Sequence, residues 1–280
     1  MARVTKRDKA NIPAGHETPL DFAVTSRDAG TLTMVRNAIQ HKEVMLAFQP
    51  VVSAADMKTP AFHEGLIRVL DETGRVIPAK DFMGAVEDNE LGRQLDCLAL
   101  QLGMNTLASH PALRLSINMS ARSIGYGRWM KTLKNGLSRH KDVGERLILE
   151  ISETSAMQVP ELVIDFMDEL QTLGISFALD DFGKGFTSFR YFKDFFFDIL
   201  KLDGRFSHNI HKDAENQIIA GGIAAIANGL DMYTVASRVE HPQDAQTLAH
   251  LGFHCLQGFL LGAPTVKPDW KTSKNDRNAA

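Results

Sequence analysis

The stretch that decides the fold runs Phe177-Ala178-Leu179-Asp180-Asp181-Phe182-Gly183-Lys184-Gly185-Phe186. An apolar run of the kind that forms buried strands ends there in two adjacent carboxylates, and a glycine-bearing loop follows. Adjacent like charges raise each other's pKa unless a cation lies between them, and oxygen ligands suit Mg²⁺, Mn²⁺ or Ca²⁺. Asp and Gly also favour ordinary turns, so this stretch taken alone predicts a turn. The ends of the other strands decide between a turn and a metal site.

Strand-like and helix-like segments alternate along the chain around this stretch. Such alternation is typical of βα units that surround a parallel sheet. About eight strands in 280 residues predict an α/β fold, a closed (β/α)8 barrel, because such a barrel takes about 250 residues. The expected strands cover residues 44–52, 61–70, 113–118, 146–151, 176–180, 198–202, 232–236 and 253–257. The expected helices cover residues 26–40, 80–109, 122–139, 160–173, 214–229 and 241–251.

Composition and charge exclude several classes of protein. A hydrophobic content of 44% is enough for one large core. A net charge of −3 gives no general attraction to nucleic acid or to an acidic membrane. Two cysteines, Cys97 and Cys255, predict no disulfide framework and no thiolate metal site. No apolar run approaches the ~20 residues of a membrane span, and residues 1–7 lack the apolar stretch of a signal peptide. We therefore expect a cytoplasmic protein with no membrane span and no nucleic-acid partner.

The chain is expected to hold one domain with a polar segment at each end. Residues 1–25 are polar and include Pro13 and Pro19, which predicts a flexible N-terminal arm. Ser26 or Asp28 is expected to cap the first helix. Residues 26–266 are expected to form the domain, and residues 267–280 a polar C-terminal tail that frays. The sequence shows no internal repeat and no second domain.

Five polar residues lie within or at the ends of apolar strands: Glu64, Asn118, Glu150, Asp180 and Lys201. Burying ionised groups is costly unless they are paired or hold a metal. Taken singly, Glu64 is explained as an edge residue, Asn118 as a turn former and Glu150 as a salt-bridge partner. The carboxyl ends of barrel strands meet on one face, where such enzymes have their active sites. Three carboxylates and one amide oxygen on that face together predict a site for a hard cation.

A set of motifs in fixed order resembles the EAL domain, a bacterial signal-transduction family of cyclic di-GMP phosphodiesterases. The resemblance covers roughly residues 30–266. It implies a TIM-like barrel whose first strand runs antiparallel to the others. The matching segments are Phe48-Gln49-Pro50-Val51-Val52, Glu64-Gly65-Leu66 with Arg68, Ile77-Pro78, Ser116-Ile117-Asn118-Met119-Ser120-Ala121, Leu149-Glu150-Ile151-Ser152-Glu153, Asp180-Asp181-Phe182-Gly183, Leu200-Lys201-Leu202-Asp203 and Gln257-Gly258-Phe259.

The resemblance implies a metal centre that uses Mg²⁺ or Mn²⁺. Glu64, Asn118, Glu150 and Asp180 match the ligands of the family's first metal. Asp181 matches a residue that helps to bind a second metal or its waters. Two metal ions about 4 Å apart can activate water and stabilise the leaving oxygen of an in-line displacement. The resemblance therefore implies hydrolysis of a phosphodiester.

Further roles follow from the same resemblance. Lys201 matches the lysine that steadies the attacking water and the phosphate. Arg68 matches a phosphate-contacting arginine, and a planar guanidinium suits a phosphodiester. Glu153 matches the glutamate that supports the loop after Asp181. Two more polar residues that line the family's site are matched by Glu240 and Gln257.

The sequence departs from the family pattern at four positions. Gly65 stands where the signature has alanine, which is expected to loosen the strand slightly. Lys184 stands where the family has a small residue, and it is expected either to contact phosphate or to lie exposed. Ser237 replaces a glutamate that acts in the family as general base or second-metal ligand, and a neutral hydroxyl is a poor substitute. Arg238 replaces a glycine, and it can repel a second metal, hold phosphate or point outward.

The substitution at Ser237 leaves three functions open. The first is binding of cyclic di-GMP with hydrolysis to linear pGpG weak or absent, because loss of a general base removes about 10²–10⁴-fold in rate. The second is an active phosphodiesterase that depends on Mg²⁺ or Mn²⁺. The third is an adaptor that binds a protein partner and no nucleotide. We favour the first. A homodimer is also expected, with an apolar surface or core packing as the alternatives for Phe192, Phe195, Phe196 and Phe197.

Overall fold

A closed barrel forms the centre of the computed structural model, which describes residues 19–185, 191 and 193–272. The strand order is β1-β9-β8-β7-β6-β5-β4-β2-β3, and the ring closes because β1 also pairs with β2. Strand β3 is a short addition outside the ring. The strands are β1 (Val44–Ser53), β2 (Pro60–Leu70), β3 (Val76–Pro78), β4 (Leu115–Asn118), β5 (Leu147–Ser152), β6 (Ser176–Phe182), β7 (Ile199–Leu202), β8 (Tyr233–Ala236) and β9 (Cys255–Leu256).

The direction of β1 distinguishes this barrel from one built only of parallel strands. Strand β1 runs antiparallel to both of its neighbours, β2 and β9. From β2 through β4 to β9, each neighbouring pair in the ring is parallel. The predicted α/β barrel with an antiparallel first strand is therefore confirmed.

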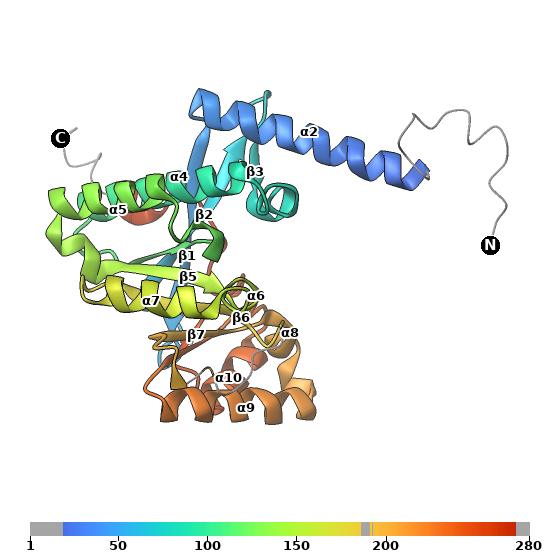
Figure 1. The fold of residues 1–280 in the computed structure, drawn as a ribbon. Helices are drawn as coiled ribbons and strands as arrows, with labels where there is room; N and C mark the ends of the chain where they lie inside the picture. Colours follow the sequence, from blue (N-terminus) through green and yellow to red (C-terminus); the bar gives the residue numbers. More distant parts are fainter. Residues whose placement is uncertain (1–18, 186–190, 192, 273–280) are drawn as a thin grey trace, which may run out of the picture.

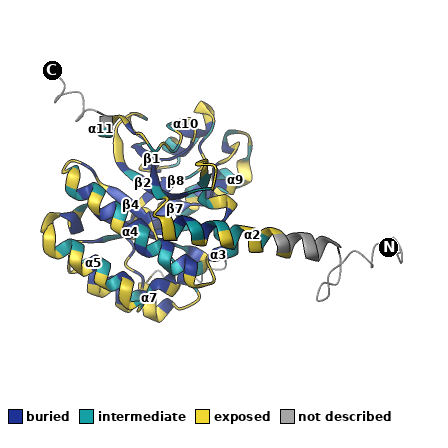
Figure 2. Ribbon diagram, turned by 90° about the horizontal axis from the view of Figure 1, so that it is seen from above, coloured by how far each residue is buried: buried dark blue, intermediate teal, exposed yellow. Residues whose placement is uncertain are grey.

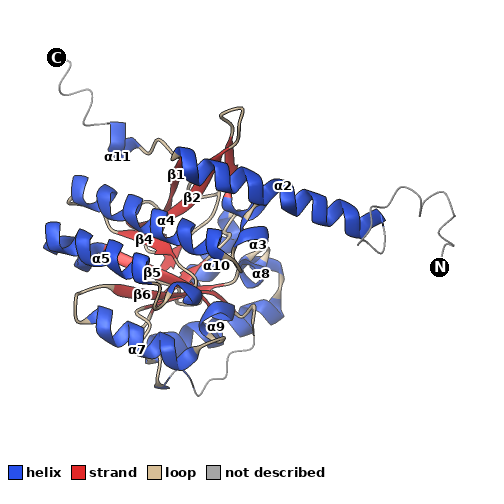
Figure 3. Ribbon diagram, turned by 45° about the horizontal axis from the view of Figure 1, so that its top comes forward, coloured by secondary structure: helices blue, strands red, loops and turns tan. Residues whose placement is uncertain are grey.

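Helices surround the barrel, and helix α2 projects beyond it (Figures 1 and 3). None of the helices in the described part of the chain combines the length and apolarity that crossing a membrane requires. The helices are α2 (Pro19–His41), α3 (Met83–Val86), α4 (Glu90–Ser109), α5 (Gly127–Arg139), α6 (Glu153–Ala156), α7 (Pro160–Gln171), α8 (Gly204–Ser207), α9 (Ala214–Gly229), α10 (Pro242–His250) and α11 (Asp269–Thr272), with short 3₁₀ turns at Ala79–Asp81, Ala121–Ser123, Lys141–Arg146 and Ile210–Lys212.

The core lies between the barrel wall and the inner faces of these helices (Figure 2). Helices α5 and α7 meet the wall through a chain of aromatic rings. The ring centroids of Trp129 and Phe166 are 5.5 Å apart, and those of Phe166 and Phe177 are 5.9 Å apart. Burial of each such side chain contributes roughly 1.5–3 kcal/mol. This packing holds β5 and β6 rigid, and with them the residues at their carboxyl ends.

The structure corrects both predicted ends of the domain. Helix α2 begins at Pro19, so the predicted cap at Ser26 or Asp28 is wrong and residues 19–25 of the expected arm are helical. Proline is favoured in the first turn of a helix because the amide it lacks would have no partner there. Residues 1–18 lie outside the described part of the chain.

The C-terminal segment is held against the barrel as far as residue 272. Helix α11 covers Asp269–Thr272, so the prediction that the chain frays from 267 onward is wrong for these residues. The Trp270 ring makes edge contacts with Phe48 and His110, at centroid distances of 5.0 and 4.9 Å. Trp270 thus holds the polar C-terminal segment against the barrel. Its partners, Phe48 and His110, lie far away in the sequence.

The phenylalanines after β6 mostly pack inward. Phe195 and Phe197 are 5% and 4% exposed, so core packing, one of the two expected alternatives, applies to them. Phe196 is 63% exposed, and Phe192 lies outside the described residues. Among the described residues of this group, Phe196 alone offers an apolar surface.

Gly65 does not loosen β2. A methyl group on Gly65 would lie 2.7 Å from Cδ1 of Ile117, and a methyl group on Gly103 would lie equally close to the same atom. The Ile117 side chain therefore fills the space between β2 and α4 that larger residues at these glycines would need. The prediction of a loosened strand is wrong, because an isoleucine on β4 replaces the missing methyl group.

We predict that Gly65→Ala lowers the free energy of unfolding by about 1–3 kcal/mol, the usual cost of overpacking. Adding Ile117→Val should recover much of this loss, because valine lacks the Cδ1 atom. Urea denaturation of the single and double variants measures both effects. Gly84→Ala is the control, since a methyl group there would meet no atom within 4 Å. Additive effects of the two substitutions would contradict this account of the packing.

Candidate functional site

A cleft of about 420 Å³ lies at the mouth of the barrel. The ends of β6, β7 and β8 meet there, as expected for the carboxyl ends of barrel strands. The predicted site residues that line it are Glu64, Asp180, Asp181, Lys201, Ser237, Glu240 and Gln257. The structure thus gathers on one face residues that are up to 193 positions apart in the sequence.

The ammonium group of Lys201 is the centre of the site. Its Nζ atom lies 2.5 Å from Glu150 Oε2, 3.1 Å from Glu64 Oε2 and 3.5 Å from Asp180 Oδ1. Lys201 is 1% exposed, so these contacts lie almost entirely out of water. Parallel pairing of β4 with β5 sets Asn118 directly opposite Glu150, which brings the amide to the same cluster.

Glu64 is held from several sides. Asn118 Nδ2 donates to Glu64 Oε1 at 2.7 Å, and Gln257 Nε2 donates to Glu64 Oε2 at 2.6 Å. Gln257 also reaches Gln49 Oε1 at 3.3 Å, and Gln49 donates to the carbonyl of Gly262 at 3.0 Å. Gln49 was missed as a site residue, although a polar residue inside an apolar strand was the signal. These hydrogen bonds orient the Glu64 carboxylate toward Lys201.

Burial and mutual repulsion set the charges of the cluster. Burial, followed by the nearby Glu64 charge, raises the pKa of Glu150 to about 8. Burial also raises the pKa of Asp180, against the pull of Lys201. Burial acts to raise the pKa of Glu64, but the Lys201 ammonium and the donors Gln257 and Asn118 outweigh it and lower the pKa. Three carboxylates thus share one ammonium, and the raised pKa values of Glu150 and Asp180 mean that Lys201 alone does not offset their burial and mutual repulsion.

The cluster has the donor set of a hard-cation site. Glu150 Oε1 is buried and has no hydrogen-bond partner, so one strong acceptor stays unused. Carboxylate and amide oxygens are the ligands that Mg²⁺ and Mn²⁺ prefer. Within the described residues no three His, Cys, Asp or Glu side chains converge at metal-binding distances, and Lys201 lies between the carboxylates. The oxygen donors suit one hard cation, and the Lys201 ammonium lies between them.

The end of β6 and the loop after it hold a residue with a left-handed backbone and an ion pair. Asp181 has a φ of 54°, in the left-handed region that favours glycine. The Lys184 ammonium lies 2.8 Å from Asp181 Oδ2. Glu153 Oε2 accepts hydrogen bonds from the backbone amides of Gly183 at 3.0 Å and Gly185 at 2.6 Å. Glu153 thus holds the start of the loop through two backbone amides, and Lys184 is paired with the Asp181 carboxylate.

Ser237 and Arg238 follow directly after β8. Ser237 is half-buried, and its backbone amide lies 3.4 Å from the carbonyl of Leu202. Arg238 has a φ of 59°, again in the left-handed region. The aliphatic part of its side chain lies across Gly204, where a methyl group on the glycine would collide with it. Both residues line the cleft, so the sequence departures lie within the site.

Arg68 lies apart from the cleft lining. It is 9% exposed, and its Nη1 atom donates to the carbonyl of Ile67 at 2.8 Å. Glu240, by contrast, lines the cleft and lies 3.8 Å from His208 Nδ1. His208 was missed because a surface histidine gives no sequence signal. The phosphate contact expected of Arg68 stays a prediction.

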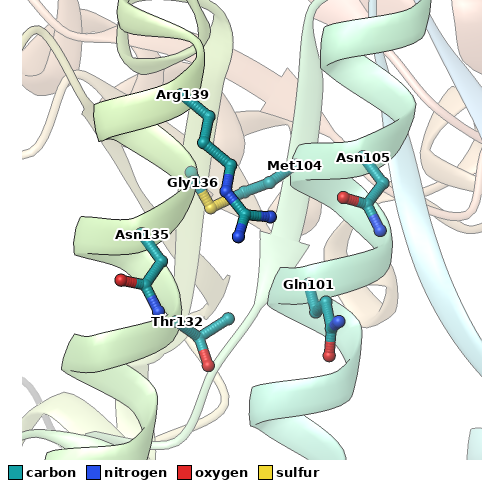
Figure 4. Close-up of a pocket in the computed structure, with 7 residues that line it drawn as sticks. All are labelled: Gln101, Met104, Asn105, Thr132, Asn135, Gly136 and Arg139. Atoms are coloured by element: carbon teal, nitrogen blue, oxygen red, sulfur yellow. The ribbon is translucent and has the colours of Figure 1, made fainter.

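A second, smaller cavity of about 240 Å³ lies between α4 and α5 (Figure 4). Its walls carry the amides of Gln101, Asn105 and Asn135 and the guanidinium of Arg139, with no carboxylate. The Met104 side chain fills the space above Gly136. None of the predicted site residues lies there, so this cavity belongs to helix packing and not to the predicted site.

We predict that Lys201→Met destabilises the protein strongly. Removing one partner from a buried charge cluster costs about 3–5 kcal/mol, because the remaining carboxylates lose their counter-ion. Urea denaturation at neutral pH measures the change. Lys80→Met, at an exposed lysine that lines the same cleft, serves as the control. A change below about 1 kcal/mol for Lys201→Met, the range of exposed pairs, would show that the cluster is not buried as described.

A model of the EAL domain family matches residues 33–264. The chain is 27% identical over 237 residues to the cyclic di-GMP phosphodiesterase PdeF of Escherichia coli strain K12. It is 28% identical over 235 residues to MucR of Pseudomonas aeruginosa, a bifunctional diguanylate cyclase and cyclic di-GMP phosphodiesterase. These matches cover 83% and 82% of this chain but 31% and 34% of the two relatives. The chain therefore spans about a third of their length.

Solved structures give the same result. The MucR phosphodiesterase in complex with cyclic di-GMP superposes with a TM-score of 0.75 at 27% identity, over 87% of this chain and 99% of that one. The EAL domain of Pseudomonas aeruginosa FimX bound to cyclic di-GMP gives 0.77 at 25% identity, over 85% and 97%. With the barrel and its polar mouth already established, the family match over most of the sequence means that this chain belongs to the EAL domain family.

Proposed function

We propose that this chain binds cyclic di-GMP at the barrel mouth with one Mg²⁺ or Mn²⁺ ion, and that its hydrolysis to linear pGpG is weak or absent. One observation carries the proposal. The carboxylates that match the family's first metal site surround the Lys201 ammonium, while Ser237, which lines the same cleft, has a neutral hydroxyl where the family pattern has a carboxylate. Related domains of MucR and FimX have been solved with cyclic di-GMP bound.

Binding uses the charges at the mouth. The ligands proposed for the cation are Glu64, Asn118, Glu150 and Asp180, and a cation held there would act as a Lewis acid on a phosphoryl oxygen. Lys201 keeps its charge, because the surrounding carboxylates raise its pKa well above the usual value despite the opposing effect of burial. Its ammonium has three donor hydrogens, which suit a phosphate oxygen or a water molecule. Gln257 keeps Glu64 in place during binding.

Hydrolysis is proposed to fail at the step that needs a base. A general base needs a pKa near the working pH, which a serine hydroxyl does not have. Two carboxylates near the mouth are already paired with lysines, Asp181 with Lys184 and Glu150 with Lys201. An active phosphodiesterase is the second candidate, because Lys201 and the four proposed ligands are all present and relatives such as PdeF are named as phosphodiesterases.

The proposal also covers the cellular compartment and the partners of the protein. Both cysteines are free and buried, which is compatible with a reducing compartment such as the cytoplasm. A homodimer or a protein partner would find an apolar contact at Phe196. Regulation through such a contact fits a signalling domain.

Calorimetry with cyclic di-GMP and Mg²⁺ tests binding, with Arg68→Ala as the variant. We predict about 10-fold weaker binding or more, because a charge-assisted hydrogen bond contributes about 1.5–3 kcal/mol. Arg75→Ala, at an exposed arginine in the turn before β3, is the matched control. Equal affinity of the Arg68→Ala variant and the wild type would remove Arg68 from the site.

Product chromatography tests the role of Ser237. We predict that Ser237→Glu with Arg238→Gly raises linear pGpG formation about 10²-fold or more, because a carboxylate returns to the end of β8. Ser237→Gln with Arg238→Gly is the control, since it has the same shape without the charge. A wild type that already turns over as fast as the glutamate variant would identify an ordinary phosphodiesterase.

A further inference from the structure

Asp181 already has a positive partner of its own. Its carboxylate forms an ion pair with Lys184 at 2.8 Å, and the backbone amide of Lys184 donates to the carbonyl of Asp181 at 3.1 Å. The turn thus fixes the lysine three residues after the aspartate. A second cation beside Asp181 would have to displace this ammonium.

Arg238 brings a positive charge to the lining of the cleft. Its backbone is held in the left-handed region at a φ of 59°, a conformation that non-glycine residues rarely adopt outside functional or tightly constrained sites. Gly204, at the start of α8, leaves room for the side chain to lie flat against the barrel mouth. Within the described residues no carboxylate forms an ion pair with Arg238, and its side chain lines the cleft together with Asp180 and Asp181.

The positive charges of Lys184 and Arg238 partly offset the carboxylates of Asp180, Asp181 and Glu240, which makes this part of the mouth less favourable to a second divalent cation. Ser237 supplies no negative charge at the end of β8, while Lys184 adds a positive charge beside Asp181 and Arg238 adds one to the cleft lining. Lysine and arginine side chains have only donors, so they bind phosphate oxygens well and repel metal ions. A second divalent cation would instead need oxygen ligands beside Asp181 that are not already paired with an ammonium or a guanidinium.

We propose that the Lys184 ammonium and the Arg238 guanidinium take the place of a second divalent cation and bind a phosphate of the nucleotide. The inference rests on the proposed binding of cyclic di-GMP. It adds that one divalent cation at most binds at the mouth, and that this chain's own side chains supply the remaining positive charge. Lys184 reaches the phosphate from the loop after β6, and Arg238 reaches it from the end of β8.

Counting bound manganese tests the cation part on the full chain without nucleotide. Electron paramagnetic resonance of free Mn²⁺ during a titration gives the number of ions bound per chain. We expect at most one ion for the wild type and one more for the triple variant Lys184→Ser, Ser237→Glu, Arg238→Gly. Lys80→Ser, which removes a charge from the cleft without touching Asp181, should leave the count unchanged. Two ions on the wild type, or no gain in the triple variant, would overturn the inference.

Calorimetry with cyclic di-GMP at saturating Mn²⁺ tests the phosphate part. Lys184→Ala should weaken binding roughly 10-fold, the effect of losing one charge-assisted hydrogen bond. Gly204→Ala should weaken it similarly, because the added methyl group displaces Arg238 while every charge is kept. Unchanged affinity in both variants would overturn the phosphate contact. A wild type that binds no cyclic di-GMP would refute the proposed function, and the manganese count would still decide the cation part.

Discussion

The buried ammonium of Lys201 is the interaction on which the barrel mouth depends. It lies among carboxylates from β2, β5 and β6, and each would be costly to bury without it. Burial and the nearby Glu64 charge raise the pKa of Glu150, so the cluster favours a proton on this group over leaving all three carboxylates charged. Metal ligands must lose their protons on binding, so a cation would take over the place of that proton. The ion pairs of Lys201 that stabilise the fold therefore also hold the carboxylates together at the barrel mouth.

Much of the barrel and of its mouth could be predicted from local sequence. Apolar runs predicted the strands, and isolated polar residues within them, such as Glu150 and Lys201, predicted which side chains converge. The contact of Trp270 with Phe48 and the filling of space at Gly65 by Ile117 could not be predicted, because each depends on a partner far away in the sequence. The left-handed backbone of Arg238 was not predicted, although the glycine that the family pattern has at this position was a signal for it.

Two parts of the site match the family pattern to different degrees. The cluster around Lys201 keeps the residues that match the family pattern, whereas the rim formed by Lys184, Ser237 and Arg238 departs from it. In the first part, Glu64, Glu150 and Lys201 are buried and pair with one another, so changing them costs folding free energy. The rim is exposed or half-buried and can change at little cost to the fold. The departures from the family pattern at Lys184, Ser237 and Arg238 therefore lie where a substitution costs the fold least.

Anomalous scattering from manganese in crystals grown with cyclic di-GMP tests the central claim most directly. The account predicts one strong peak per chain, bounded by oxygens of Glu64, Asn118, Glu150 and Asp180, with the Lys184 and Arg238 side chains on a phosphate of intact nucleotide. Two peaks about 4 Å apart, the second beside Asp181, would contradict it, since that is the spacing of a two-metal hydrolase.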